Sequence, residues 1–331
     1  MLDDRKSKVL KALVEEYIRT GEPVSSQAVL GRIGIRVSSA TIRNDLARLE
    51  SYGFVSQPHT SAGRLPTDQG YRFYVDHLAP SRLREATRER IDEFFQEVHR
   101  QISEVLKDTS LFVNELTSYP SVVVGPAMST DTIKDIRLVP LGGSIVLVVA
   151  VAANGRVHQD FVDVGGVVDE DTIESAERLL AAAFEGRTLD APQDDGLRRS
   201  DLPAAVKRVV LPVEDQLKAT RSDQEIYVSG TSRMASLWND LTMVQNLLGL
   251  LEEEASLISL LADDPEGTHV RFGSDIGTGG DLAVVTTTYE TSSGATGHVG
   301  VIGPMRMNYK RTIRVVEGVT ERLEDRFGAG K

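Results

Sequence analysis

The sequence predicts an α+β protein built from more than one domain. Residues 1–80 contain short apolar segments with helical spacing and a hairpin signal, whereas strand-like runs alternate with longer amphipathic helices from residue 81 onward. A length of 331 residues corresponds to two or three domains of ordinary size. The chain contains no Cys, which excludes disulfides, cysteine nucleophiles and thiolate metal sites.

Charge is distributed unevenly along the chain, whose formal net charge is −12. Residues 1–80 carry 11 Lys and Arg against 9 Asp and Glu, a net charge of +2, so residues 81–331 carry 26 against 40, a net charge of −14. Six arginines and only three acidic residues lie between residues 32 and 72. Because charges beyond a screening length of about 8 Å contribute little, this segment can meet phosphate on an otherwise acidic protein. An ordinary solvated surface explains the same charge, so the residue pattern must distinguish the two.

The sequence shows no targeting or membrane signal. The N-terminus lacks the apolar core of a signal peptide, and no apolar stretch approaches 18 residues. Because Cys is also absent, we expect a cytoplasmic protein with no membrane partner.

Three short helices are predicted at the start of the chain. Apolar residues repeat at helical spacing over residues 9–18, and Gly21 ends that helix. Ser25 and Ser38 each follow an apolar residue and precede a further helical segment, which is the pattern of an N-cap with its hydrophobic staple. Only a short turn, residues 34–36, separates the second helix from the third. This order predicts a helix-turn-helix.

The third of these helices has two chemically distinct faces. Ile42, Leu46 and Leu49 fall on one side and must point into the core. The other side carries small residues among Arg and Asn, which can read guanine and adenine in a major groove. An ordinary amphipathic helix, the alternative, would more often expose Lys and Glu. The candidate DNA-contacting residues at this helix are Ser38, Ser39, Ala40, Thr41, Arg43, Asn44 and Arg48.

A hairpin is predicted directly after this helix. Gly53 ends the helix, residues 54–57 form a short strand, and residues 65–66 begin the return strand, after which Thr67 caps another helix. The loop between the strands, residues 58–64, is rich in turn formers and has a polar tip. A hairpin in this position is the wing of a winged helix-turn-helix, and its tip suits phosphate or minor-groove contact. The candidate residues of the wing are His59, Thr60, Ser61 and Arg64.

We expect these candidates to divide into two roles. Arg43 and Asn44 are predicted to contact base edges. Phosphates are predicted to be held by Ser38, Ser39, Arg48 and Arg64. The six histidines are not spaced as metal ligands, so no metal site is expected.

The remaining chain alternates predicted strands with long helices. Strand-like runs lie between residues 122 and 164, and Asn154 with Gly155 is a two-residue hairpin signal between two of them. Helices are predicted over residues 82–118, 169–186, 199–221 and 233–262 and after Asn308, the expected N-cap of the last helix. This order describes an α+β domain that a helical stretch interrupts.

No catalytic motif is recognisable. Gly297, Gly300 and Gly303 repeat every third residue, but the strand–glycine loop–helix unit of a dinucleotide site is missing, as are a P-loop and a nucleophile elbow. We therefore expect neither an enzyme nor a cofactor. Arg306 is predicted to cap or pair at the start of the last helix rather than to bind an anion.

Two segments more than 200 residues apart carry a family resemblance. They read SSATIRNDLARLESYGFVSQPHTSAGRLPTDQGYRFYVD over 38–76 and GVIGPMRMNYKRTI over 300–313. Together they resemble the two signature regions of HrcA, the family of bacterial heat-inducible transcription repressors. The first segment partly resembles other winged-helix repressors too, including the DeoR group, whereas its wing string PHTSAGRLPTDQGYR is more specific. Residues 272–276 depart from the family pattern.

The resemblance implies a domain organisation that periodicity does not show. It comprises a winged-helix DNA-binding domain over 1–80 and a GAF-like α+β domain formed by 81–165 and 223–331. An inserted helical dimerisation domain over 166–222 interrupts the GAF-like domain. The helices at 169–186 and 199–221 are then expected to supply the dimer contact.

The resemblance also implies a function. It describes a homodimeric repressor of chaperone genes that binds an inverted-repeat operator on double-stranded DNA and is released on heat stress, with a GroEL-type chaperonin promoting the active form. Because the acidic part of the chain repels itself, we hypothesise that unfolding of the repressor senses heat. The alternative is a metabolite-sensing winged-helix regulator of the DeoR-like kind, whose GAF-like domain binds a small molecule.

Overall fold

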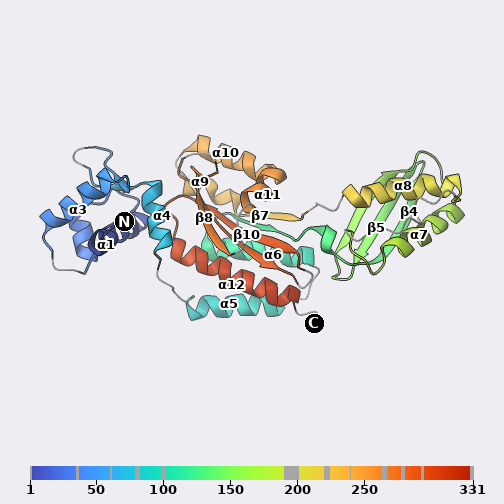
Figure 1. The fold of residues 1–331 in the computed structure, drawn as a ribbon, viewed down its shortest axis with the longest axis horizontal. Coiled ribbons are helices and arrows are strands. Elements are labelled where there is room, and N and C mark those ends of the chain that lie inside the picture. Colours follow the sequence, from blue (N-terminus) through green and yellow to red (C-terminus); the bar gives the residue numbers. More distant parts are fainter. Residues whose placement is uncertain are drawn as a thin grey trace.

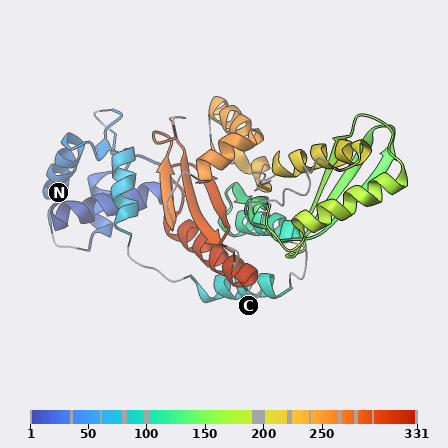
Figure 2. The same cartoon turned by 45° about the vertical axis from the view of Figure 1, so that its right-hand side comes forward.

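The computed structural model describes residues 2–34, 37–59, 62–78, 83–97, 102–189, 201–219, 224–238, 240–262, 267–276, 280–291 and 294–328. The chain forms three units in a row, with a mainly helical head at one end and a body around a five-stranded sheet in the middle (Figure 1). A smaller unit with a three-stranded sheet lies at the other end, as a second view also shows (Figure 2). The predicted α+β class is confirmed.

The head, residues 2–78, contains the predicted helices and hairpin. Its elements are α1 (Asp4–Thr20), α2 (Ser26–Arg32), α3 (Ser39–Ser51), β1 (Val55–Ser56), β2 (Leu65–Pro66) and α4 (Asp68–Asp76). The side-chain oxygens of Asp3, Ser25, Ser38 and Thr67 each accept a hydrogen bond from the backbone N–H three residues later. The predicted caps at Ser25, Ser38 and Thr67 are therefore confirmed.

One apolar core holds the helices of the head together. Leu10 and Leu13 of α1 share it with Ile42, Leu46 and Leu49 of α3, and all five side chains are buried. Burying a side chain of this size contributes about 1.5–3 kcal/mol. These contacts therefore decide which face of α3 points outward.

Gly70, in the first turn of α4, lies against the backbone that precedes β1. A Cβ at this position would lie 2.2 Å from the carbonyl oxygen of Phe54, and a backbone atom cannot move aside as a side chain can. Gly70→Ala is therefore expected to destabilise the head by about 1–3 kcal/mol.

Gly31→Ala in α2 is the matched control, because a Cβ there meets no atom within 4 Å. It is expected to stabilise the head by about 0.4–1 kcal/mol. Hydrogen exchange of the α3 amides in the full chain measures both changes. Equal protection in the two variants would contradict the predicted clash.

The body is built on an antiparallel sheet with helices on both faces. Its strands are β3 (Ser121–Val124), β7 (Ile226–Ser229), β8 (Thr268–Phe272), β9 (Ala283–Glu290) and β10 (Thr296–Gly303), in the order β7-β3-β10-β9-β8. Its helices are α5 (Glu85–Glu97), α6 (Ile102–Thr117), α9 (Met234–Leu237), α10 (Leu241–Glu252), α11 (Glu254–Ala262) and α12 (Tyr309–Gly328). Val123 and Val285 pack toward α6 and α12, whereas Val122 and Val284 pack toward α9–α11. The sheet is thus covered on both sides.

The chain leaves the body sheet after β3 and returns to it at β7. The residues between form the third unit, called the insert here, which has its own core. Its elements are β4 (Ile133–Gly142), β5 (Ile145–Ala152), β6 (Val157–Asp163), α7 (Glu170–Phe184) and α8 (Ala204–Ala219). The predicted hairpin at Asn154 and Gly155 is confirmed, since it joins β5 to β6.

The insert has a larger extent than the sequence predicts. The prediction assigns residues 81–165 to the body, whereas Val146, Val148 and Ala150 of β5 belong to the same core as Leu180 of α7. The apolar residues of these segments predict strands, but they do not show which helices cover them. Pattern alone therefore could not separate the two sheets.

Candidate nucleic-acid interface

α3 lies at the outer end of the head, away from the insert (Figure 1). Ile42, Leu46 and Leu49 are buried on its inner side, as predicted. The residues exposed on its outer side are Ala40, Arg43, Asn44, Ala47 and Arg48. The structure therefore brings the predicted helix residues together on one accessible face.

Both carboxylates of α3 are paired with arginines outside the helix. Asp45 is buried and accepts two hydrogen bonds from the guanidinium of Arg5 in α1, at 2.8 and 3.0 Å. Glu50 pairs with Arg64, which follows the hairpin loop, at 3.0 Å. Each acid is thus neutralised locally and tied to a neighbouring element.

The outer face of α3 is therefore basic. Arg43 and Arg48 are exposed, and neither forms an ion pair within the described ranges of the chain. Ala40 and Ala47 beside them leave room for close approach. Such a face combines phosphate attraction with side chains that can read base edges.

The start of α3 offers backbone donors as well. The Oγ of Ser38 accepts from the Thr41 N–H at 3.1 Å and lies 2.9 Å from the Thr41 hydroxyl. Ser38 is exposed, and Ser39 is partly exposed beside it. The first N–H groups of a helix have no partner within the helix, and their partial positive charge attracts phosphate.

The hairpin residues are placed differently from one another. His59 is exposed, whereas Thr60 and Ser61 lie outside the described residues. Arg64 was predicted to hold phosphate, but its side chain is only 16% exposed and pairs with Glu50. The position of Arg64 indicates that it fixes the hairpin against α3, so its geometry does not favour a phosphate contact.

Sequence reasoning missed the role of Arg5. It lies 40 residues before Asp45, and sequence separation gives no sign of their contact. A signal did exist in the helix itself, because Asp45 falls on the same side as Ile42 and Leu49. A carboxylate on a buried face needs a partner, so the helical wheel alone could have indicated a missing cation.

The C-terminal signature segment has a mixed outcome. Asn308 caps the last helix, accepting from the Arg311 N–H at 3.2 Å, as predicted. Arg306 does not act at that helix start; its guanidinium donates to the Leu237 carbonyl at 3.3 Å, at the end of α9. The capping prediction for Arg306 is therefore corrected.

Within the part of the chain that the structure describes, no group of three or more His, Asp or Glu side chains is placed to hold a metal ion. No helix in the same ranges is long and apolar enough to cross a membrane.

Comparison with known proteins identifies the family. Residues 103–313 match the family model described as the HrcA protein C-terminal domain. The heat-inducible transcription repressor HrcA of Acidothermus cellulolyticus is 38% identical and aligns over 96% of this chain and 97% of its own length. The HrcA of Symbiobacterium thermophilum is 33% identical over 98% of both chains. The crystal structure of a hypothetical protein is 27% identical, covers 100% of both chains and has a TM-score of 0.64.

The family model spans more than half of the chain, and these relatives align with it almost from end to end. Both signature segments found in the sequence lie within those alignments, so the resemblance does not rest on one motif. This chain belongs to the HrcA family.

Proposed function

We propose that this chain is a DNA-binding transcription repressor whose head is a winged helix-turn-helix. The observation that carries the proposal is the outer face of α3, where Arg43, Asn44 and Arg48 lie among alanines. Because Asp45 and Glu50 are paired elsewhere, no carboxylate of the helix opposes DNA. A helix fits the major groove, and the hairpin that follows has the position of a wing. The names of the relatives, heat-inducible transcription repressors, agree with this function.

The proposed contacts follow from the side chains and their positions. Arg43 and Asn44 read base edges in the major groove. Phosphates are held by Arg48 and by the exposed start of α3 with Ser38 and Ser39, while Ala40 and Thr41 line the approach. The wing residues His59, Thr60 and Ser61 contact the adjoining backbone or minor groove.

The insert exposes an apolar sheet face on the side opposite α7 and α8. β5 reads IVLVVAVA, and a strand that is apolar at every position is typical of burial on both faces. Only alternate residues of β5 are buried in this chain. Leu147 on the open side lies between Val139 and Phe161 of the neighbouring strands, which are 43% and 68% exposed. This face therefore fits contact with another protein surface.

A second copy of the chain is the proposed occupant of this face. The sequence led us to expect the dimer contact from α7 and α8, but their apolar sides are buried against the sheet of their own insert. The open sheet face can pack on its own copy about a two-fold axis. The dimer contact is therefore assigned to β4, β5 and β6 rather than to the helices.

A symmetric dimer determines the form of the operator. One head covers too few base pairs to compete with the excess of non-specific genomic sites. Two heads related by a two-fold axis read two half-sites related by the same axis, which is an inverted repeat. Duplexes selected by the protein from a random library will show whether the bound sequences have this form.

Heat release is the proposed regulation, with loss of the folded state in the cytoplasm as the sensor and a GroEL-type chaperonin as the partner that restores it. Residues 81–331 carry a net charge of −14, and the repulsion lowers the stability of the compact state. After a mild heat step, operator binding is expected to fall and to return when chaperonin and ATP are added. Full binding after heating, with no gain from chaperonin, would refute the folding-sensor mechanism.

A second candidate function is regulation by a metabolite. A pocket of about 410 Å³ lies between the head and the body, where Tyr17 and Gly21 face Trp238, Asp281 and Arg306. Burial raises the pKa of Asp281, although the hydrogen bond from the Met305 N–H and the charge of Arg306 oppose the shift. A ligand of this pocket would stabilise the folded state, so thermal unfolding with a panel of metabolites distinguishes this candidate from the ligand-free repressor.

A further inference from the structure

The two signature segments meet where the head joins the body. Tyr71 and Tyr74 of α4 lie 6.1 and 6.5 Å from Tyr309 of α12, measured between ring centroids. Phe272 at the end of β8 lies 6.2 Å from both Tyr71 and Tyr309. All four rings are buried. This aromatic cluster connects the helix after the hairpin to the body.

A polar contact flanks the aromatic cluster on one side. The guanidinium of Arg72 in α4 donates to the Asp275 carboxylate and, at 3.3 Å, to the Ser274 hydroxyl, and it lies 5.1 Å from the Phe272 ring centroid. Burial raises the pKa of Asp275, but hydrogen bonds from Arg72 and from the Phe272 N–H outweigh burial and hold it below its usual value. Asp275 is thus a charged acceptor for the head.

A second ion pair joins α12 to the head. Lys310 pairs with Glu15 of α1 at 2.5 Å, and its ammonium lies 5.9 Å from the centre of the Tyr74 ring. Arg72 and Lys310 therefore connect α4 and α1 of the head to two different elements of the body. Two attachments of this kind restrict rotation of the head, whereas one alone would leave a pivot.

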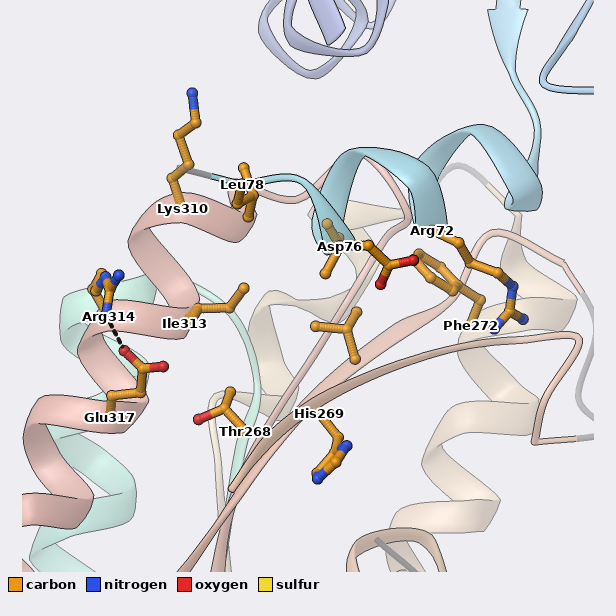
Figure 3. Close-up of a pocket in the computed structure, with 12 residues that line it drawn as sticks. Arg72, Asp76, Leu78, Thr268, His269, Phe272, Lys310, Ile313, Arg314 and Glu317 are labelled. Atoms are coloured by element: carbon orange, nitrogen blue, oxygen red, sulfur yellow. Dashed lines mark hydrogen bonds and ion pairs between the residues drawn. The ribbon is translucent and has the colours of Figure 1, made fainter. Parts of the chain in front are cut away.

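The contact between the head and the body is limited in area, because an open cleft lies beside the aromatic cluster. A cleft of about 440 Å³ lies between α4, β8 and α12, with Arg72 and Phe272 at one end and Lys310 and Arg314 along α12 (Figure 3). Close packing is missing on this side of the joint. The orientation of the head therefore depends strongly on the aromatic cluster and the two ion pairs.

A buried contact within the insert lies where its chain leaves the body sheet. Arg156 at the start of β6 is 2% exposed and donates to the Asp131 carboxylate at 2.9 Å and to the Pro126 carbonyl at 3.0 Å. Residues 126 and 131 follow β3 of the body sheet. The guanidinium of Arg156 also lies 3.9 Å from the carboxylate of Glu225, which precedes β7, so Arg156 contacts both chain segments that connect the insert to the body.

We propose that Arg72, Asp275 and Lys310 are positioning residues for DNA binding, which fix the head on the body and thereby set the distance between half-sites that the dimer accepts. This inference rests on the proposed function of the head and the dimer. None of the three residues lies on the outer face of α3, so they act on the geometry of binding and not on base recognition. It also gives the 272–276 loop, which departs from the family pattern, a role in docking the head.

The test measures binding against the spacing of half-sites. The variant is Arg72→Met with Lys310→Met, and the control is Arg314→Met, because Arg314 lines the same cleft but pairs with Glu317 of its own helix. Full-length protein is titrated by fluorescence anisotropy on one selected half-site and on inverted pairs whose spacing grows by single base pairs over one helical turn.

The parent and the control are expected to bind the best spacing at least about 30-fold more tightly than the worst, because only a fixed pair of heads gains from simultaneous contact. The double variant is expected to show a difference below about threefold, with affinity for the single half-site unchanged. Arg72→Asp alone is expected to weaken the spacing preference. Combining it with Asp275→Arg is expected to restore part of that preference, since the ion pair is rebuilt with its charges exchanged.

An unchanged spacing profile in the double variant would overturn the inference while leaving the proposed function intact. Loss of half-site binding in that variant would also overturn it, because the substitutions would then act on the head itself. If the parent binds a selected half-site no better than random DNA, the proposed function fails and the inference with it. These outcomes are separable in the same titrations.

Discussion

Phe161→Asp is expected to convert the proposed dimer into monomers and to raise its dissociation constant by about 30- to 1,000-fold, the range for a central aromatic contact. Phe161 is 68% exposed on β6 and sits in register with Leu147 and Val139 on the open sheet face. A carboxylate there would be buried without a partner in the two-fold interface. Loss of the second head should then weaken operator binding by about 100- to 10,000-fold, since the two sites no longer act together.

Sedimentation of the full chain measures this change directly. Leu241→Asp in α10 is the matched control, because Leu241 is a large apolar residue that is 71% exposed on the body and not on the insert. The control should remain a dimer. A Phe161→Asp variant that stays dimeric at the concentrations of the parent would show that β4, β5 and β6 do not form the interface.

Asn44→Ala is expected to reduce operator affinity by about 1–3 kcal/mol while leaving affinity for random DNA unchanged, because a base-edge contact is lost and no phosphate contact changes. Asn44 is exposed on the outer face of α3, between Arg43 and Arg48 in the sequence. Arg48→Ala should instead weaken operator and random DNA alike and lower the slope of log affinity against log salt by about 1.

Anisotropy titrations at several salt concentrations separate the two effects. Asn246→Ala is the control for Asn44→Ala, since Asn246 is an exposed helical Asn in α10 of the body and not on the outer face of α3. Its operator affinity should equal that of the parent. If Asn44→Ala binds operator and random DNA as the parent does, α3 is not oriented toward base edges in the way that its exposed face indicates.

The position of α3 could be predicted from the sequence because two local rules agree there. Ser38 supplies the cap, and Ile42, Leu46 and Leu49 repeat with the period of a helix that has one buried side. Once those three residues face the core, the outward direction of Asn44 follows from 100° per residue. In a helix, the direction of a few buried residues thus determines the direction of every other side chain.

The ion pairs of the site could not be predicted in the same way. Asp45 finds Arg5 and Glu50 finds Arg64 through tertiary contacts, and the count of charges between residues 32 and 72 treats both acids as opposing DNA. In the structure neither acid opposes DNA at the outer face, because each is neutralised by an arginine away from that face. The number of charged residues in a segment is therefore a poor guide to the charge of its surface when its acids form ion pairs with residues of other elements.

The insert shows a second limit of sequence reasoning. The apolar run of residues 145–152 predicts a strand, which the structure confirms, but it does not show which surfaces cover that strand. The α7 and α8 helices lie on one side, whereas the other side remains open in the single chain. The open face of β5 is evident only in the structure, where β4, β5 and β6 form a sheet separate from that of the body.

We propose that this member of the HrcA family reads DNA with two copies of α3 held in a symmetric dimer. Selection of bound duplexes from a random library, followed by sequencing and by sedimentation of the complex, tests this arrangement. We expect enrichment of inverted repeats with one preferred spacing, two chains on each duplex, and affinity at least about 1,000-fold above that for random DNA. Enrichment of a single unpaired site, or binding of all duplexes with equal affinity, would contradict it.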